Sequence, residues 1–379
     1  MYSDRLATLF DRKDYPVDAF DIRKRLHGRE LIAYGAGECC HWFVEIVMKI
    51  HGYRPSVFLD RRFSAGDLFE GIPAMSPDAF QPGEDQKANA VAVICSGNEK
   101  YVGEIRERLR TMGIRDILLL RDVYEVHNPF SLPSELAREG FGYYSRHERE
   151  IRDALELLQD DESREVYVRC LQTHMERRPT LLPQRPRKEQ YFPRDIALGK
   201  GYDRFVCCGS YDGDTVRLLN EVIGKVRDIV CFEPEGHLFA RLADNISSQS
   251  RTLAERIVCL PCAVYDEDRT LRFASGSGLG SRIAEWGNAL VQAVRLDHAL
   301  PGFEPTFICM DVEGVELNVL QGSRRVLSES RPDLGVCVYH APNQLWEIPL
   351  FLHGLRLGYR LFLRNYTGFT QETVLYATV

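Results

Sequence analysis

The sequence predicts an α/β protein built from two doubly wound parallel sheets that a helical connector joins. Two stretches share one pattern, in which a short apolar run ends at a glycine turn and leads into an amphipathic helix: residues 29–50 and 203–223. Apolar runs bounded by glycine are typical of buried parallel strands. A chain of 379 residues can hold two such units at about 150 residues per domain. Both units are therefore expected to be Rossmann-like.

The predicted domain organisation follows from these two units and the segment between them. We place an N-terminal Rossmann-like domain at residues 1–126, a connector at 127–195 and a second Rossmann-like domain at 196–379. Residues 146–158 and 163–175 carry apolar side chains at helical spacing. Residues 178–194 hold four prolines among positive charges, which favours an extended, solvated strap.

Composition excludes several classes of protein. The formal net charge of −7 argues against a nucleic-acid partner, which would need clustered positive charge. Most of the 11 cysteines lie in or beside apolar runs, where a free thiol behaves as a small hydrophobe. Cys259 and Cys262 form a C-x-x-C without a second ligand pair, so no zinc site is predicted. No stretch reaches the about 20 apolar residues of a membrane span, and we expect a cytoplasmic protein without a membrane partner.

The N-terminal unit has the order of a nucleotide-binding sheet but not its full fingerprint. Gly35 and Gly37 follow the first strand, and Asp60 follows the second, at the distance expected of a ribose-binding acid. The third glycine of the fingerprint is Cys40 here. Three interpretations stay open: a nucleotide or nucleotide-sugar pocket, a docking or dimerising module, and a sheet that binds nothing. An NAD-dependent sugar oxidoreductase is disfavoured because a Tyr-x-x-x-Lys pair is missing near this sheet.

The C-terminal unit carries the stronger signal. Gly209 and Gly213 bracket the first turn, and Glu233 follows the second strand, where an open parallel sheet binds its ligand. A carboxylate there commonly accepts hydrogen bonds from both ribose hydroxyls. The loop lacks the Gly-x-Gly-x-x-Gly of a pyrophosphate cradle, so S-adenosylmethionine is the predicted ligand. The alternative is that Glu233 only caps the helix after Pro234.

Further strands are predicted to complete the second sheet. Apolar runs place them at residues 257–260, 307–310, 334–338, 360–364 and 373–377, with helices at 237–246 and 317–327. A short strand pair is expected around residues 271–273, followed by a Gly/Ser-rich loop at 276–281. The last two strands should form a hairpin in which one strand is antiparallel.

Several motifs in this half occur together and in one order. They are residues 208–215, Phe232-Glu233-Pro234, Arg295-Leu296-Asp297, residues 311–316 with Leu320-x-Gly322, and Tyr339-His340 with residues 346–349. This set resembles the FkbM family of S-adenosylmethionine-dependent O-methyltransferases over about residues 191–379. The resemblance implies a sheet of methyltransferase type, cofactor binding by Gly209, Gly213 and Glu233, and a reacting centre near Asp311. It also implies methylation of a hydroxyl on a sugar or a secondary metabolite.

Two residues depart from the family pattern. Cys207 stands at the end of the first strand, where the family usually has an acid, and Cys309 precedes the D-x-E-G-x-E signature, where it usually has a lysine. Losing a charged hydrogen-bond acceptor costs about 1.5 to 3 kcal/mol. These departures keep a rival hypothesis open, in which the chain is a non-catalytic cofactor or nucleotide-sugar binding protein with a degenerate site.

Methyl transfer to a hydroxyl needs alignment of the reacting atoms and a group that takes the proton. Asp311 ends a strand, Glu313 and Glu316 follow it, and His340 ends the next strand. These acids can hold a hydroxyl or a hard cation, although acids also favour a helix N-terminus for its dipole. We assign catalysis to Asp311, Glu313 and His340, with His340 as the candidate base, and we predict no metal.

The predicted function is S-adenosylmethionine-dependent O-methylation of a sugar, glycan or related metabolite, as in polysaccharide biosynthesis. A homodimer is left open as the assembly. Predicted cofactor contacts are Gly209, Ser210, Tyr211, Gly213, Glu233, Pro234 and Ala263. Predicted substrate contacts are Glu316, Tyr339 and Trp346. The aromatic side chains among them offer flat surfaces for a sugar, although packing explains them equally well.

Overall fold

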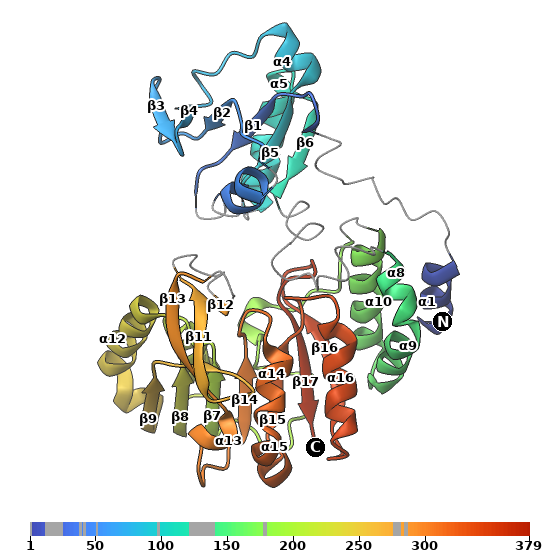
Figure 1. The fold of residues 1–379 in the computed structure, drawn as a ribbon, viewed down its shortest axis with the longest axis vertical. Helices are drawn as coiled ribbons and strands as arrows, with labels where there is room; N and C mark the ends of the chain where they lie inside the picture. Colours follow the sequence, from blue (N-terminus) through green and yellow to red (C-terminus); the bar gives the residue numbers. More distant parts are fainter. Residues whose placement is uncertain are drawn as a thin grey trace.

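The computed structural model describes residues 2–11, 26–37, 40, 43–50, 52–96, 99–120, 141–176, 180–275, 282–283 and 287–379. The predicted Gly/Ser-rich loop at 276–281 lies outside these residues. Two sheets stand apart in Figure 1, the N-terminal one above and the C-terminal one below. No helix among the described residues is long and apolar enough to cross a membrane.

The N-terminal sheet has six strands in the order β3-β4-β2-β1-β5-β6. All neighbours are parallel except β3 and β4, which form an antiparallel pair. Its elements are β1 (Leu31–Tyr34), the π-helix η1 (Phe43–Ile50), β2 (Val57–Leu59), β3 (Asp67–Phe69), β4 (Ile72–Met75), α4 (Glu84–Asn89), β5 (Val91–Ile94), α5 (Glu99–Thr111) and β6 (Asp116–Leu119). Alternate strand residues enter two separate apolar clusters, one on each face, as a sheet covered on both sides requires.

The C-terminal sheet has seven strands in the order β16-β17-β15-β14-β7-β8-β9. Its strands are β7 (Arg204–Cys208), β8 (Val226–Phe232), β9 (Ala254–Leu260), β14 (Phe307–Met310), β15 (Asp333–Cys337), β16 (Arg360–Asn365) and β17 (Thr373–Thr378). β17 is antiparallel to both β15 and β16, and the other pairs are parallel. The predicted fold class, including the closing hairpin, is confirmed.

Helices and a small sheet surround these strands. The helices are α11 (Asp214–Val222), α12 (Gly236–Leu253), α13 (Leu296–Ala299), α14 (Glu316–Gln321), α15 (Arg324–Ser330) and α16 (Gln344–Gly354). The small sheet has the order β10-β13-β11-β12 and consists of β10 (Ala263–Val264), β11 (Arg269–Ala274), β12 (Arg282–Ile283) and β13 (Ala289–Val294).

The single helix predicted at 317–327 is two helices in the structure. The chain breaks at Gly322, where an added Cβ would lie 2.1 Å from the carbonyl oxygen of Tyr265. Only glycine permits this close approach between the helix and the strand region after β10. A helical period alone does not reveal such a contact.

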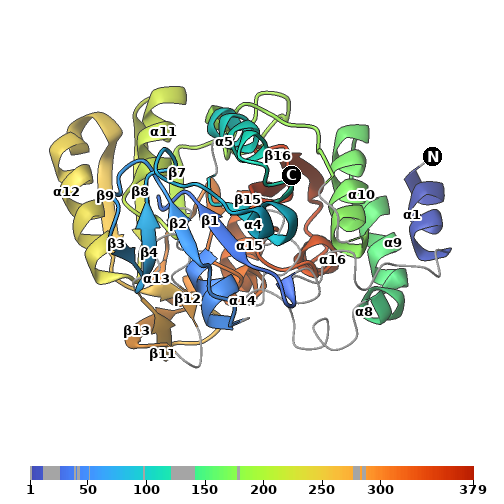
Figure 2. The same cartoon turned by 90° about the horizontal axis from the view of Figure 1, so that it is seen from above.

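The helices of the predicted connector, which lie between the two sheets in the sequence, pack as a layer on the C-terminal sheet. They are α8 (Phe141–Arg146), α9 (Glu148–Leu157) and α10 (Asp161–Glu176). Their buried residues belong to the same apolar cluster as β7, β14 and α16. The N-terminal helix α1 (Tyr2–Asp11) joins this layer through Leu6 and Leu9, and Figures 1 and 2 both place it beside α9 and α10.

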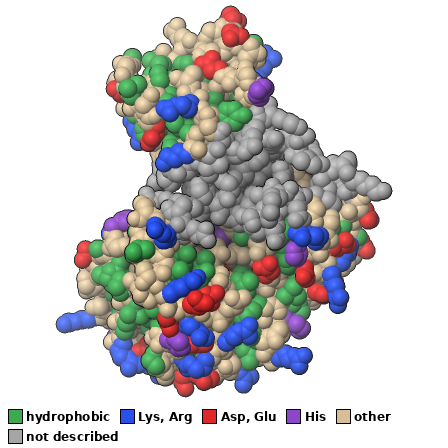
Figure 3. Space-filling model, viewed as in Figure 1, with side chains coloured by type: hydrophobic (Ala, Val, Ile, Leu, Met, Phe, Trp, Pro, Cys, Tyr) green, Lys and Arg blue, Asp and Glu red, His purple; other side chains and the backbone are tan. Residues whose placement is uncertain are grey.

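Buried charge fixes this layer to the sheet edge. Arg364 on β16 is 2% exposed and pairs with Asp160 before α10, at 2.6 Å, and with Asp195 at 2.7 Å. On the surface, acidic and basic side chains are mixed over the face shown in Figure 3. Charge therefore does not single out a binding region on that face.

Candidate functional site

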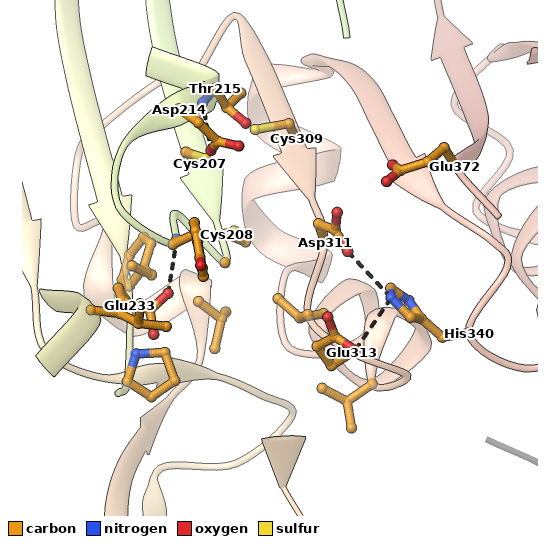
Figure 4. A pocket seen from close by; sticks show the side chains of 18 of the residues that line it. Cys207, Cys208, Asp214, Thr215, Glu233, Cys309, Asp311, Glu313, His340 and Glu372 are labelled. Atoms are coloured by element: carbon orange, nitrogen blue, oxygen red, sulfur yellow. Dashed lines mark hydrogen bonds and ion pairs between the residues drawn. The ribbon is translucent and has the colours of Figure 1, made fainter. Parts of the chain in front are cut away.

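A cavity of about 590 Å³ opens at the carboxyl ends of the C-terminal strands, which is the usual ligand position in such a sheet. Figure 4 shows two groups of side chains on its walls. One group surrounds Glu233 at the end of β8. The other holds Asp311 and Glu313 after β14 and His340 after β15. Ser96 and Leu120, which follow β5 and β6 of the N-terminal sheet, also line the cavity.

The loop from Gly209 to Gly213 is held rigidly by charged groups from two helices. The Asp212 carboxylate lies 3.0 Å from the guanidinium of Arg217 on α11 and 2.7 Å from that of Arg241 on α12. Asn245 donates a hydrogen bond to the Asp212 carbonyl at 2.8 Å. Tyr211 adopts a left-handed φ of 47° in this loop and lines the cavity. The loop therefore has its shape before any ligand binds. The sequence did not predict the contacts of Asp212 that hold it.

Glu233 is buried, and the chain's own backbone orients its carboxylate. One oxygen accepts a hydrogen bond from the Tyr211 amide and the other from the Glu235 amide, each at 2.9 Å. Burial raises the pKa of Glu233 to about 7, against the lowering effect of these two hydrogen bonds. A second lone pair on each oxygen stays available for donors such as ribose hydroxyls. The alternative from the sequence was that Glu233 only caps the helix after Pro234. Its carboxylate instead joins the Tyr211 amide of the loop to the amide of Glu235, the N-cap residue of α12, and it keeps the capacity that the cofactor role requires.

Gly209 is required by packing as well as by the cavity. Its φ is +80°, and an added Cβ would lie 1.9 Å from the carbonyl oxygen of Asp311. Gly213 caps α11 with a φ of 89° and packs on Leu242, and it is not among the residues that line the cavity.

We expect Gly209→Ala to destabilise the protein by about 2 kcal/mol or more, from left-handed strain and steric overlap together. The overlap would also displace Asp311. Gly224→Ala is the matched control, because Gly224 has a φ of +95° but meets nothing within 4 Å. Urea unfolding of both variants measures the difference, and equal losses would show that the contact with Asp311 has no energetic weight.

Asp311, Glu313 and His340 converge on one point of the cavity wall. His340 Nε2 lies 3.3 Å from Asp311 Oδ1 and 3.6 Å from Glu313 Oε2, as the dashed lines in Figure 4 mark. Glu313 has a left-handed φ of 57°, an unfavourable conformation for a non-glycine residue that turns the chain back toward β15. The predicted catalytic residues are thus adjacent in space.

Glu316 supports this group from behind the cavity wall. It is fully buried, and its Oε1 lies 2.8 Å from His340 Nδ1. The same carboxylate accepts hydrogen bonds from the Val312 amide at 3.1 Å and from the side chain of Gln344. Glu316 therefore orients the histidine and the turn, and it is not among the cavity-lining residues where a substrate contact would lie.

Electrostatics set the charge of this group. Burial alone would lower the pKa of His340, but the carboxylates of Glu316 and Glu313 and the contact with Asp311 raise it well above its ordinary value. Burial would raise the pKa of Asp311, and the His340 contacts lower it overall. The surrounding carboxylates thus favour the protonated form of His340 when no cation is bound.

The strap contributes a cavity wall, which the sequence did not predict. Tyr191 and Tyr339 donate hydrogen bonds to the two oxygens of Asp311, at 3.3 and 3.4 Å. Arg187 and Gln190 of the strap both contact the carboxylate of Glu372, and all three line the cavity. The segment around the 3₁₀ turn η2 (Arg187–Glu189) is therefore part of the site and not a solvated connector.

Cys207 and Cys309, the two departures from the family pattern, are neighbours. They face each other in register on β7 and β14, are 1% and 2% exposed, and both border the cavity. The acid and the lysine that the resemblance leads one to expect would thus form a pair. Replacing both by thiols removes the two charges together and leaves neither of them buried alone.

The other predicted site residues divide into two sets. Tyr211, Pro234, Ala263 and Tyr339 line the cavity with those above. Ser210 is 1% exposed and donates to the Cys207 carbonyl, while Trp346 is 1% exposed and packs on Tyr143 and Tyr144 of α8, so both serve the core. A position at a strand end or in a motif does not tell from the sequence whether a side chain faces the cavity or the core.

The predicted nucleotide site of the N-terminal sheet has its acid engaged locally. Asp60 accepts hydrogen bonds from the Ala36 amide at 2.8 Å and the Arg62 amide at 3.1 Å. Gly35 has a φ of +96°, and Gly37 is exposed. Ligand binding by Gly35, Gly37 and Asp60 stays a prediction.

Comparison with known proteins concerns the domain and the fold in which this site lies. Residues 208–361 match the family model for the methyltransferase FkbM domain. The crystal structure of methyltransferase FkbM from Methylobacillus flagellatus KT is similar over 99% of both chains, with a TM-score of 0.72 and 22% identity. The fold with both sheets is therefore shared with that protein. No curated protein sequence matches the chain.

Two more solved structures are similar to part of the chain. Aeropyrum pernix fibrillarin with natively bound S-adenosyl-L-methionine aligns with 50% of this chain and 73% of its own, at 12% identity and a TM-score of 0.32. A putative rRNA-methylase from Clostridium thermocellum aligns with 52% of this chain and 99% of its own, at 9% identity and a TM-score of 0.35. Both TM-scores are below the level at which a shared fold follows.

Proposed function

We propose, from the FkbM methyltransferase domain at residues 208–361, that the protein transfers a methyl group from S-adenosylmethionine to a hydroxyl of a sugar, glycan or related small metabolite. The observation that carries this proposal is one cavity with Glu233 on one wall and Asp311, Glu313 and His340 on another. The first wall fits a nucleoside, and the second fits a hydroxyl that must lose a proton.

The residues around Glu233 fit the cofactor. Glu233 lines the cavity beside the fixed loop, and the apolar side chains of Leu238, Ala263 and Val264 line the same cavity. Two hydroxyl donors would offset the cost of an ionised carboxylate in this buried position. When bound there, with its ribose at Glu233, S-adenosylmethionine would supply the methyl group and a sulfur leaving group that accepts the electron pair of the broken bond.

The residues around Asp311 serve the acceptor. The acceptor oxygen uses a lone pair to form the new bond to the methyl carbon, and its proton passes to a carboxylate of Asp311 or Glu313. Tyr191 and Tyr339 hold Asp311 in place, which contributes alignment. Polar side chains of Arg187, Gln190 and Glu372 nearby suit an acceptor with several hydroxyls.

Calorimetric titration with S-adenosylmethionine, followed by assay of S-adenosylhomocysteine release with a panel of glycosides and nucleotide sugars, tests the proposal. Absence of binding at millimolar cofactor would refute it. The rival function, a binding protein with a degenerate site, is favoured only by Cys207 and Cys309. Turnover by the natural sequence, with both cysteines in place, would exclude that rival.

Cofactor affinity should depend on pH through Glu233. Its carboxylate must be ionised to accept both ribose hydroxyls, and its pKa in the free protein is about 7. Since apparent affinity scales with the competent fraction, the dissociation constant should be about tenfold higher at pH 6 than at pH 8. The α-amino group of the ligand titrates near pH 8 as well. Glu233→Gln therefore serves as the reference, and identical pH profiles for the variant and the natural protein would contradict this role.

A further inference from the structure

The group formed by Asp311, Glu313 and His340 has the composition and spacing of a cation site. One donor atom from each of the three residues lies within 4.8 Å of the others. Metal–ligand bonds of about 2.0 to 2.2 Å place neighbouring ligand atoms roughly 2.8 to 3.1 Å apart in octahedral geometry and roughly 3.3 to 3.6 Å apart in tetrahedral geometry. The distances from His340 Nε2 to Asp311 and Glu313 are 3.3 and 3.6 Å, so small side-chain rotations would bring the three atoms to the octahedral spacing.

The orientation of the imidazole is the second indication. Glu316 Oε1 faces Nδ1 at 2.8 Å, which directs Nε2 toward the cavity. A carboxylate behind the non-ligating nitrogen is the usual arrangement of histidines that bind metals, because it fixes the tautomer and the ring. Glu316 is itself anchored by the Val312 amide and by Gln344, so the group that orients the ring is also fixed in place.

His340 is 4% exposed, and both of its ring nitrogens, Nδ1 and Nε2, are among the buried side-chain atoms without a hydrogen-bond partner in the described part of the chain. Nδ1 faces the Glu316 carboxylate at 2.8 Å, whereas Nε2 faces the cavity. Its contacts with Asp311 and Glu313 are ion-pair distances rather than hydrogen bonds. A buried polar atom without a hydrogen bond is costly unless another ligand satisfies it. Nε2 points at the place where the two carboxylates converge, as Figure 4 shows.

From these observations we infer that Asp311, Glu313 and His340 bind a divalent cation, with Glu316 as the residue that positions the histidine. Two carboxylates and one imidazole favour Mn²⁺ or Mg²⁺ over a soft metal, since no thiol belongs to the group. Three protein ligands leave open positions for hydroxyl oxygens of an acceptor. A cation bound there lowers the pKa of a bound hydroxyl. That catalytic role rests on the proposed methyltransferase function, whereas binding of the cation does not.

The site is tested without cofactor or acceptor by titrating the full chain with Mn²⁺. The electron paramagnetic resonance signal of free Mn²⁺ measures how much stays unbound. We expect one Mn²⁺ per chain at micromolar concentrations and competition by Mg²⁺. Asp311→Asn and Glu313→Gln should each weaken binding at least tenfold, and Glu316→Gln about tenfold through misorientation of His340. Asp214→Asn is the matched control, because this carboxylate borders the same cavity but is outside the group.

Circular dichroism melting of each variant separates loss of the site from loss of the fold. Substitution of Asp311 or Glu313 threatens the fold less than substitution of Glu316, because their side chains are 31% and 27% exposed at the cavity wall and that of Glu316 is fully buried. Absence of saturable Mn²⁺ binding, or equal binding by Glu313→Gln and the natural protein, would overturn the inference. Calorimetric binding of S-adenosylmethionine is measured separately, so failure of the metal site and failure of the proposed function give different results.

Discussion

Asp311→Asn should lower kcat by about 10² to 10⁴, which is the usual contribution of a group that takes a proton in the transition state. The amide has the shape of the carboxylate and can still accept a hydrogen bond through its oxygen from Tyr191 or Tyr339, so the local structure should persist. The amide cannot accept the acceptor's proton, and it removes a negative charge beside His340. Affinity for S-adenosylmethionine should change by less than about threefold, because Asp311 and Glu233 stand on different walls of the cavity.

Initial rates at saturating substrates and calorimetric cofactor titration measure the two quantities. Asp214→Asn is again the matched change from carboxylate to amide on the cavity wall, and its kcat should stay within about fivefold of the natural value. If Asp311→Asn retained more than about a fifth of kcat, the proton would have another acceptor. If instead its cofactor affinity fell as far as its rate, Asp311 would act in binding rather than in catalysis.

The strand-end residues show how much of the site the sequence alone predicts. Short apolar runs predicted every strand of the C-terminal sheet, and the position of a residue just after a run placed Glu233, Asp311 and His340 at one edge. This succeeds because carboxyl ends of parallel strands meet at the same edge of the sheet. The convergence of side chains there is a property of the topology, which the pattern of runs determines.

Side-chain direction and long-range contact could not be predicted in the same way. Glu316 and Trp346 belong to motifs next to the site, yet both point into the core. The strap around Arg187 is polar and proline-rich. It forms a cavity wall because Arg187 contacts the carboxylate of Glu372, 185 positions away in the sequence. Helix α1 similarly packs on α9 and α10, although the whole N-terminal sheet lies between them in the sequence. Such contacts depend on tertiary packing and leave no local sequence signal.

The last prediction concerns Cys207 and Cys309, which lie directly opposite each other on β7 and β14. Charges introduced at these two positions should therefore interact. Cys309→Lys alone places an ammonium at a position that is 2% exposed, and we expect it to destabilise the protein by about 3 kcal/mol. Adding Cys207→Asp supplies a partner across the strand pair, and the coupling in a double-mutant cycle should recover about 1 to 3 kcal/mol. Thermal and urea unfolding of the four proteins measure this coupling.

Cys231→Asp is the control for that cycle. Cys231 is also buried and sits in register with Cys207 on β8, one strand further from Cys309. In the Cys309→Lys background, an acid at position 231 should therefore couple to the introduced ammonium much less than an acid at position 207. Equal coupling from positions 207 and 231 would mean that position 207 is not a specific partner for a charge at position 309. Strong coupling only at position 207 would explain why both charges are missing together, since a chain that lost one alone would carry an unpaired charge in its core.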